Sequence, residues 1–178
     1  SHSNCPHAFL FVGPVGVGKF EVAISFAKFL NCKNNKFEID NVCDCDQCVS
    51  FDKKIHPDIY IIEKQEDKKE IVDSQIIDKN KKEGVIYKIN NSPIFGRYNI
   101  VIIRNAELMN KTVSNTILKS LEEPKDHTIF ILTTNSKESL LKTIVSRCLV
   151  MPFSLLNKKE LDFFIPLDFD KQRKDLIF

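Results

Sequence analysis

Residues 13–20 read Gly-Pro-Val-Gly-Val-Gly-Lys-Phe, a glycine-rich run that fits the pattern GxxxxGK. A short apolar run, Ala8–Val12, comes directly before it and is typical of a buried strand. Apolar residues repeat at helical spacing directly after it, over Lys19–Leu30. A strand, a glycine-rich loop and a helix in this order are the setting that a phosphate-binding loop requires.

The side chains of this loop fit phosphate binding. Gly13, Gly16 and Gly18 let backbone N–H groups approach phosphate oxygens, and the start of the helix adds its positive end. Lys19 is placed to reach the outer phosphates. These four residues are the predicted nucleotide contacts of the loop.

The rest of the chain alternates apolar strands with amphipathic helices, which predicts an α/β fold with a doubly wound, parallel, five-stranded sheet. Residues 1–153 are expected to form this domain, and 154–178 an extension or the start of a further domain. Turn residues are concentrated over 84–98. Further strands are expected at Asp58–Glu63, Asn99–Ile103, Thr128–Thr133 and Leu149–Phe153, and further helices at Ile71–Lys82, Lys111–Glu123 and Lys137–Val145.

Composition limits the class of protein. The 178 residues suit one domain with a sizeable core, and no apolar run approaches the length of a membrane span. No secretory leader is evident, so a soluble cytoplasmic protein without a membrane partner is expected. The 26 basic and 24 acidic residues give a net charge of +2, too balanced for nucleic-acid binding by bulk electrostatics.

The magnesium anchors of a hydrolase are missing from this loop. The residue after Lys19 is normally Ser or Thr, whose hydroxyl holds the cation, and here it is Phe20. The strand ending at Ile103 continues as Arg104-Asn105, where an acidic pair is expected. Magnesium binding is therefore not expected. An active hydrolase that uses Glu63 or Glu107 instead remains the alternative, although Glu107 also suits a helix N-terminus.

Four of the six cysteines crowd into residues 32–48. In a cytoplasmic protein such clustering favours a metal site over disulfides, with reduced free thiols as the alternative. Four thiolates suffice for a closed tetrahedral zinc site. The candidate ligands are Cys32, Cys43, Cys45 and Cys48, whereas Cys5 and Cys148 stand apart.

Several motifs at once are similar to those of bacterial DNA polymerase III clamp-loader subunits, which are AAA+ proteins. They are Leu-Lys-Ser-Leu-Glu-Glu-Pro at 118–124, Ile-Leu-Thr-Thr-Asn at 131–135 and Ser-Arg-Cys at 146–148, with His-Ala-Phe-Leu-Phe at 7–11 and His-Pro-Asp at 56–58. The resemblance runs from His7 to Phe153. It implies an AAA+ domain with an inserted zinc loop, held by the four clustered cysteines, and places Thr134 at the sensor position.

Within that family, the resemblance is to the delta-prime type, which lacks the magnesium residues but keeps Ser-Arg-Cys. It implies that Arg147 serves in trans, completing the ATP site of a neighbouring motor subunit, because a forked guanidinium can neutralise charge on a transferred phosphoryl group. ATP or ADP would bind weakly or not at all. The implied partners are gamma/tau and delta subunits, and, through the assembly, the sliding clamp and primer-template DNA. The resemblance also implies lid and collar domains, of which 154–178 are expected to hold at most the beginning.

Other interpretations of the sequence stay open. The chain is alternatively an active gamma/tau-like ATPase or another phosphate-loop NTPase. A stand-alone zinc-dependent nucleic-acid binder is a further alternative, although no basic and aromatic stripe accompanies the cysteines. Without the family pattern, Arg147 is interpreted as a plain surface arginine.

Overall fold

A parallel five-stranded sheet forms the centre of the molecule. The computed structural model describes residues 6–34, 43–77 and 84–155. The strand order is β2-β3-β4-β1-β5, and every pairing is parallel, so the predicted fold class is confirmed. The strands are β1 (Ala8–Val12), β2 (Ile59–Ile62), β3 (Asn99–Ile103), β4 (Thr128–Thr134) and β5 (Leu149–Pro152).

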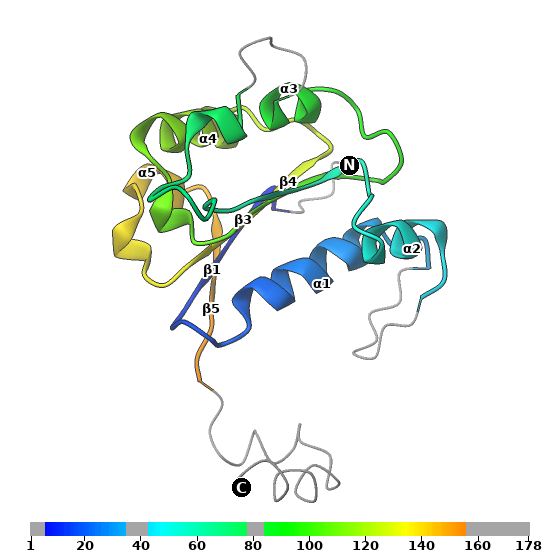
Figure 1. Cartoon of the computed structure of the whole chain (residues 1–178), viewed down its shortest axis with the longest axis horizontal. Helices are drawn as coiled ribbons and strands as arrows, with labels where there is room; N and C mark the ends of the chain where they lie inside the picture. Colours follow the sequence, from blue (N-terminus) through cyan, green and yellow to red (C-terminus); the bar gives the residue numbers. More distant parts are fainter. Residues whose placement is uncertain (1–5, 35–42, 78–83, 156–178) are drawn as a thin grey trace, which may run out of the picture.

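Helices cover both faces of this sheet (Figure 1). One face carries α1 (Lys19–Asn31) and α2 (Asp46–Asp52). The opposite face carries α3 (Val85–Ile89), α4 (Lys111–Glu122) and α5 (Lys142–Val145). Short 3-10 turns complete the chain at Asp73–Gln75, Ala106–Leu108 and Lys137–Ser139. Among the helices of the described ranges, none has the length and apolar character needed to span a bilayer.

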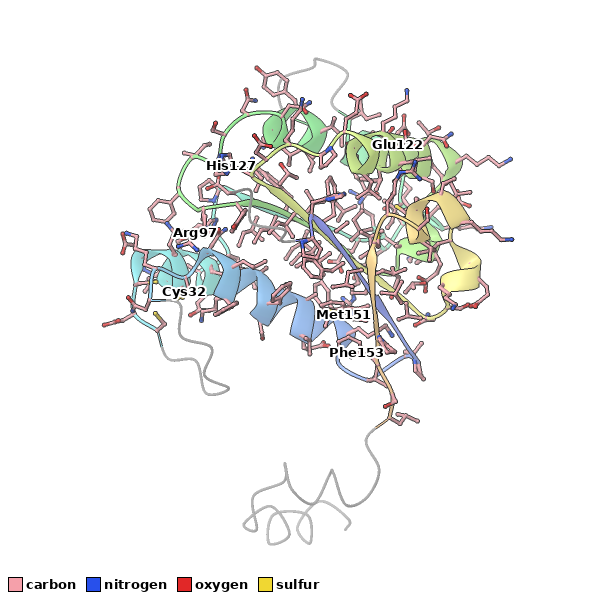
Figure 2. The ribbon with its side chains drawn as sticks, turned by 180° about the vertical axis from the view of Figure 1, so that it is seen from behind. Cys32, Arg97, Glu122, His127, Met151 and Phe153 are labelled. Atoms are coloured by element: carbon pink, nitrogen blue, oxygen red, sulfur yellow. The ribbon has the colours of Figure 1, made fainter. Side chains whose placement is uncertain are left out.

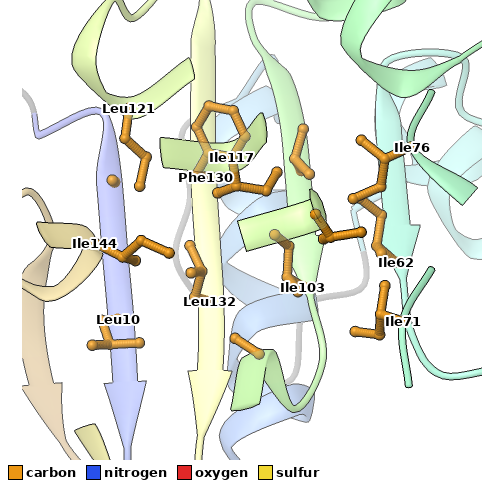
Figure 3. Close-up of a cluster of buried hydrophobic side chains, with 14 of the residues drawn as sticks. Leu10, Ile62, Ile71, Ile76, Ile103, Ile117, Leu121, Phe130, Leu132 and Ile144 are labelled. Carbon is orange, nitrogen blue, oxygen red and sulfur yellow. The ribbon is translucent and has the colours of Figure 1, made fainter. Parts of the chain in front are cut away.

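Two hydrophobic cores explain why the strands are continuous apolar runs in the sequence. Successive side chains of a strand point to opposite faces, and both faces of this sheet are covered. Leu10 and Leu132 face α4 and α5, where they meet Ile117 and Ile144 (Figure 3). On the other face, strand residues pack against the small side chains of α1, in a cluster formed by Phe9, Phe11, Ile100, Ile102, Ile129, Ile131, Ala23 and Ala27.

Helix α4 forms as its sequence predicts. The side chain of Asn110 caps it by accepting a hydrogen bond from the Val113 backbone N–H at 2.9 Å. Val113, Ile117 and Leu121, four residues apart, are its buried residues. It ends two residues before Pro124, which cannot continue a helix.

The predicted helix over Ile71–Lys82 is wrong in its described part. Ile71 instead pairs as an isolated bridge with Met109: its N–H donates to the Leu108 carbonyl at 2.8 Å and its carbonyl accepts from Asn110. Pairing with a distant segment extends the backbone there, and only a 3-10 turn follows at Asp73–Gln75. Residues 78–82 lie outside the described ranges.

The predicted helix over Lys137–Val145 is also wrong as a continuous element. It divides into a 3-10 turn at Lys137–Ser139 and α5, separated by extended backbone at Leu140 and Leu141. Leu140 is buried in the α4 face of the core, and the extended backbone brings it there. Two short helices, α2 and α3, were not predicted, because each spans fewer than two clear helical repeats.

Candidate functional site

The carboxyl ends of β1, β3 and β4 meet at one edge of the sheet. The N–H of Gly13, just after β1, donates to the carbonyl of Thr134 at the end of β4 over 3.2 Å. The N–H of Asn105, just after β3, donates to the Thr133 hydroxyl over 3.0 Å. The phosphate loop and the positions that normally carry magnesium acids therefore lie together, in the crevice where parallel α/β sheets bind ligands.

The loop has the backbone that phosphate binding requires. Gly16 and Gly18 have φ values of 84° and 82°, a region that side chains rarely adopt. Gly13 is needed for another reason, because a Cβ there would collide with the carbonyl of Phe153. The loop leads directly into α1 at Lys19.

The ammonium of Lys19 lies inside the loop. Its Nζ donates to the carbonyls of Gly13 and Pro14, each at 2.6 Å, and to Asn135 Oδ1 at 3.3 Å. Only 7% of the residue is exposed. Burial lowers the pKa of Lys19, against an opposing attraction from the Glu107 carboxylate. An incoming phosphate therefore has to draw this lysine away from the backbone carbonyls.

The two residues that replace the magnesium anchors contact each other. The Arg104 guanidinium lies over the Phe20 ring, 4.6 Å from its centroid, which is a cation–π arrangement. Arg104 Nη1 is also 3.1 Å from Glu63 Oε2. Where a hydrolase holds a cation, this chain therefore places a ring, a guanidinium and the carboxylate that pairs with it.

Glu107 and Thr134 are engaged within the protein. The side-chain amide of Asn135 donates to Glu107 Oε1 at 2.8 Å, and Glu107 Oε2 is buried with no hydrogen-bond partner in the described structure. The fully buried Thr134 donates its hydroxyl to the Ser136 carbonyl at 3.0 Å. The side chain of Asn135, which directly follows Thr134, thus bridges Lys19 and Glu107.

Arg147 follows α5, and Figure 1 shows α5 on the opposite face of the sheet from α1 and α2. Its Nη1 donates to the Thr143 carbonyl at 2.9 Å, and its Nη2 is 3.0 Å from Glu122 Oε1. The side chain is 36% exposed. The neighbouring Cys148 packs against the core, and burial raises the pKa of its thiol to about 11.

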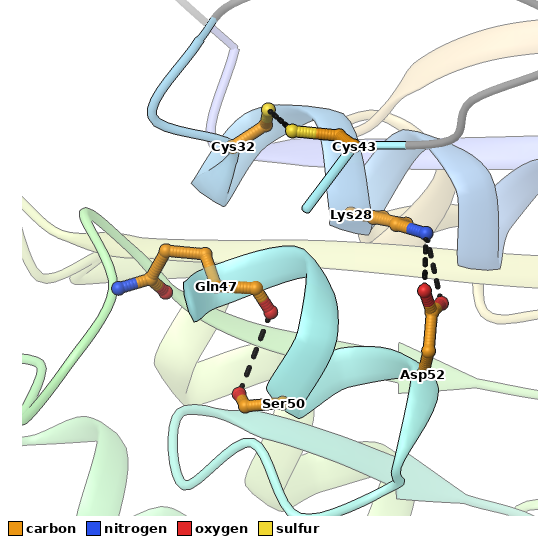
Figure 4. Close-up of polar contacts among 6 residues, drawn as sticks. All are labelled: Lys28, Cys32, Cys43, Gln47, Ser50 and Asp52. Atoms are coloured by element: carbon orange, nitrogen blue, oxygen red, sulfur yellow. Dashed lines mark hydrogen bonds and ion pairs between the residues drawn. The ribbon is translucent and has the colours of Figure 1, made fainter. Parts of the chain in front are cut away.

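The four clustered cysteines come together as a metal site requires. Their Sγ atoms all lie within 4.8 Å of one another, and those of Cys32 and Cys43 are 3.6 Å apart (Figure 4). A tetrahedral zinc with bonds of about 2.3 Å needs sulfurs about 3.8 Å apart, so the set fits zinc. Without a cation the thiols titrate unequally. The pKa of Cys48 is raised by burial, whereas hydrogen bonds outweigh burial at Cys45 and lower its pKa to about 7. Cys5 lies outside the described ranges.

Two residues adjacent to the cysteines hold the segment 95–98. Asn31, next to Cys32, accepts hydrogen bonds from the N–H groups of Arg97 and Tyr98 at 2.9 Å each and donates to the Tyr98 carbonyl. Gln47, next to Cys48, donates to the Phe95 carbonyl at 2.6 Å. The cysteine cluster is thereby connected to the segment that leads into β3.

His56 and Asp58, which lie just before β2, anchor the same segment. Both oxygens of the fully buried Asp58 are used: Oδ1 accepts from the Ile94 N–H at 2.8 Å, and Oδ2 accepts from the Phe95 and Gly96 N–H groups at 2.7 and 2.6 Å. His56 Nε2 lies 2.7 Å from Gln47 Oε1, and its Nδ1 accepts from the Asp58 N–H. Burial lowers the pKa of His56, consistent with a neutral ring.

With the geometry established, comparison with known proteins identifies the family. A family model described as "DNA polymerase III, delta subunit" matches residues 1–157. The chain belongs to this family.

Curated relatives of this DNA polymerase III family include both subunit types that the motifs resemble. The delta' subunit of Pseudomonas aeruginosa is 34% identical over 143 residues, which is 80% of this chain and 41% of that protein. The delta' subunit of Bacillus subtilis is 31% identical over 157 residues, 88% of this chain and 44% of that protein. The tau subunit of Escherichia coli is 29% identical, over 87% of this chain and 23% of that protein. The chain spans less than half the length of each.

A solved structure confirms the fold of this family member. The DNA polymerase III gamma subunit-related protein of Thermotoga maritima superposes with a TM-score of 0.55 at 19% identity, covering 96% of this chain and 45% of that one. At this identity the likeness concerns the fold alone.

Sequence reasoning missed three residues of the site. Asn135 carried a signal, since it is the first residue after a buried strand that ends beside the loop. Asn31 and Gln47 carried no signal of their own, since each is an isolated polar residue directly before a cysteine of the cluster.

Proposed function

We propose that this chain is a non-hydrolysing, delta-prime-type subunit of the DNA polymerase III clamp loader, which supplies Arg147 to the ATP site of a neighbouring subunit. The observation that carries the proposal is the Phe20–Arg104 pair at the vacated magnesium position. Phosphoryl transfer by phosphate-loop proteins uses a metal that bridges the phosphates. A guanidinium at that position repels a divalent cation.

The alternative magnesium ligands are engaged elsewhere. Glu63 pairs with Arg104, and Glu107 accepts a hydrogen bond from Asn135. Recruiting Glu63 would first break its ion pair with Arg104, and the oxygen of Glu107 that has no hydrogen-bond partner in the described structure, Oε2, is buried. We therefore infer that ATP or ADP binds weakly or not at all. Any such binding would use the loop glycines, Lys19 and the region of Thr134, without magnesium.

Arg147 has the properties that a residue acting in trans requires. It is permanently charged, it is partly exposed, and it follows a short helix at the surface. Arginines that complete a neighbouring phosphoryl-transfer site contribute about a thousandfold or more in rate. In this interpretation Arg147 contributes its charge to an ATP site that belongs to a neighbouring subunit.

The proposed zinc, domain bounds and partners rest on what membership in the family implies. Zinc in the four-cysteine site would stabilise the connection between α1 and α2, where four thiolates supply the binding energy that a small core lacks. Residues 1–153 would form the AAA+ domain, and 154–178 would form a C-terminal extension or the start of a lid domain. The partners would be gamma/tau and delta subunits, with the sliding clamp and primer-template DNA reached through the assembly in the cytoplasm.

The decisive experiment compares two variants in a clamp loader reconstituted from the subunits of the same organism. Arg147→Ala should lower ATP hydrolysis at the neighbouring site about a thousandfold, and should thereby depress total hydrolysis and clamp loading by the assembly. Lys19→Ala should change both rates little, because the loop it belongs to does not hydrolyse ATP. Normal rates with Arg147→Ala, or magnesium-dependent phosphate release by this chain alone that Lys19→Ala abolishes, would overturn the proposal.

A further inference from the structure

Glu122, at the end of α4, forms an ion pair with Arg147. It is the last residue of α4, and its Oε1 is 3.0 Å from Nη2 of Arg147. Figure 2 shows Glu122 on the side of the molecule away from the Cys32 cluster. The two residues are distant in sequence, so the contact depends on how α4 and α5 pack.

Both partners are attached to helices that contribute to one hydrophobic core. Leu121, next to Glu122, is buried in the same core cluster as Ile144, which lies in α5 just before Arg147. Arg147 has a second attachment, since its Nη1 donates to the Thr143 carbonyl at 2.9 Å. The guanidinium is thus held at two points, one on each helix.

This attachment leaves most of the guanidinium available. An arginine has five N–H donors in a fixed fork, and the described structure engages one at each terminal nitrogen. The side chains of Arg147 and Glu122 remain 36% and 43% exposed. An ion pair of this exposure is weak, so Arg147 loses little on taking up a phosphate oxygen. What Glu122 supplies is orientation.

We propose that Glu122 is the positioning residue for Arg147. It keeps the long arginine side chain in one orientation before a neighbour's nucleotide arrives, so that less conformational freedom is lost when the site assembles. This inference rests on the proposed trans role of Arg147. Glu122 itself does not touch the transferred phosphate, because a carboxylate there would oppose the charge that Arg147 neutralises.

The test uses the reconstituted assembly, with this chain as wild type, Glu122→Ala, Glu122→Gln or Glu123→Ala. Glu122→Ala should lower kcat for ATP roughly two- to tenfold, the effect of leaving one long side chain unrestrained, with KM unchanged. Glu122→Gln retains a hydrogen-bond acceptor and should recover most of the rate. Glu123→Ala is the matched control: this neighbouring acid is exposed and makes no ion pair within the described residues, so its rate should stay normal.

A double variant separates the inference from the function on which it rests. In the Arg147→Ala background, Glu122→Ala should cause no further loss, because the group that it positions is gone. If Arg147→Ala lowers the rate but Glu122→Ala does not, or lowers it equally in both backgrounds, the positioning role is refuted. If Arg147→Ala itself has no effect, the trans function fails. Thermal unfolding of each variant chain, with unchanged midpoints expected, shows that the differences are not due to misfolding.

Discussion

Removing the proposed zinc from the cysteine site should loosen the segment 97–98 while leaving its neighbours protected. The perturbation is zinc removal by a chelator, or Cys48→Ser, in the isolated chain. Asn31 accepts hydrogen bonds from the N–H groups of Arg97 and Tyr98, and it lies directly before Cys32. Without a metal to fix Cys32, the end of α1 loses its attachment and Asn31 can withdraw from both groups.

The magnitude is set by the three hydrogen bonds of Asn31 to this segment, including the one that its side-chain amide donates to the Tyr98 carbonyl. Each contributes about 1 kcal/mol net, so their loss lowers the free energy of local opening by about 3 kcal/mol. This corresponds to amide exchange about 150-fold faster at Arg97 and Tyr98. The preceding N–H groups of Phe95 and Gly96 donate instead to the carboxylate of Asp58, a buried residue directly before β2, and not to Asn31. Their exchange should hardly change.

Hydrogen exchange followed by NMR resolves these amides one by one. Elemental analysis first establishes that the starting material holds one zinc per chain. Equal exchange at Arg97 and Tyr98 in metal-loaded and metal-free protein would show that the site does not support this segment. Acceleration spread evenly from Ile94 to Ile103 would also refute the reasoning, because it would indicate global and not local loosening. Absence of zinc from protein purified without chelator would remove the metal proposal itself.

Three further outcomes are expected. Asp58→Ala should destabilise the fold by about 3 to 5 kcal/mol, measured by urea denaturation, because it leaves three backbone N–H groups without their acceptor. The control variant Asp52→Ala removes an exposed ion pair with Lys28 and should cost about 1 kcal/mol or less. Burial lowers the pKa of His56, so the unfolded chain binds a proton at this residue more readily than the folded chain does. The free energy of unfolding should therefore decrease as the pH drops below about 6.5. His56→Gln should show a smaller decrease between about pH 7.5 and 5.5, and the same dependence on pH in both proteins would contradict the neutral ring. Asn110→Ala should lower stability by about 1 kcal/mol through loss of the α4 cap, measured by thermal unfolding, with an unchanged midpoint as the contrary result.

The sequence predicted the sheet well because burial on both faces leaves a simple pattern. Ile100 and Ile102 face α1, and Val101 and Ile103 face α4, so all four positions are apolar and the strand is plain to see. The helix expected from Ile71 fails for the opposite reason. Its apolar spacing is real, but it serves a bridge to Met109, and no local pattern records a partner that far along the chain.

The sequence shows which residue types stand at the candidate site, but not their contacts. Phe20 and Arg104 are visible in the sequence alone at the positions where magnesium ligands are expected. That the two side chains touch is a tertiary fact, because they lie on α1 and after β3, and their meeting depends on strand order and side-chain rotamers. The Glu122–Arg147 pair was missed for the same reason. The four cysteines were easier to interpret, since three of them lie within six residues.

The contact between Phe20 and Arg104 also limits how this domain can change through single substitutions. Exchanging Phe20 for a serine alone would restore a hydroxyl, but beside a guanidinium that repels the cation. Exchanging Arg104 for an aspartate alone would place a second carboxylate near Glu63 and leave the ring where a metal ligand belongs. Neither single step yields a magnesium site, and each breaks a contact that the present pair makes. At least two substitutions, at positions 20 and 104 together, are therefore needed before magnesium ligands can stand at this edge of the sheet.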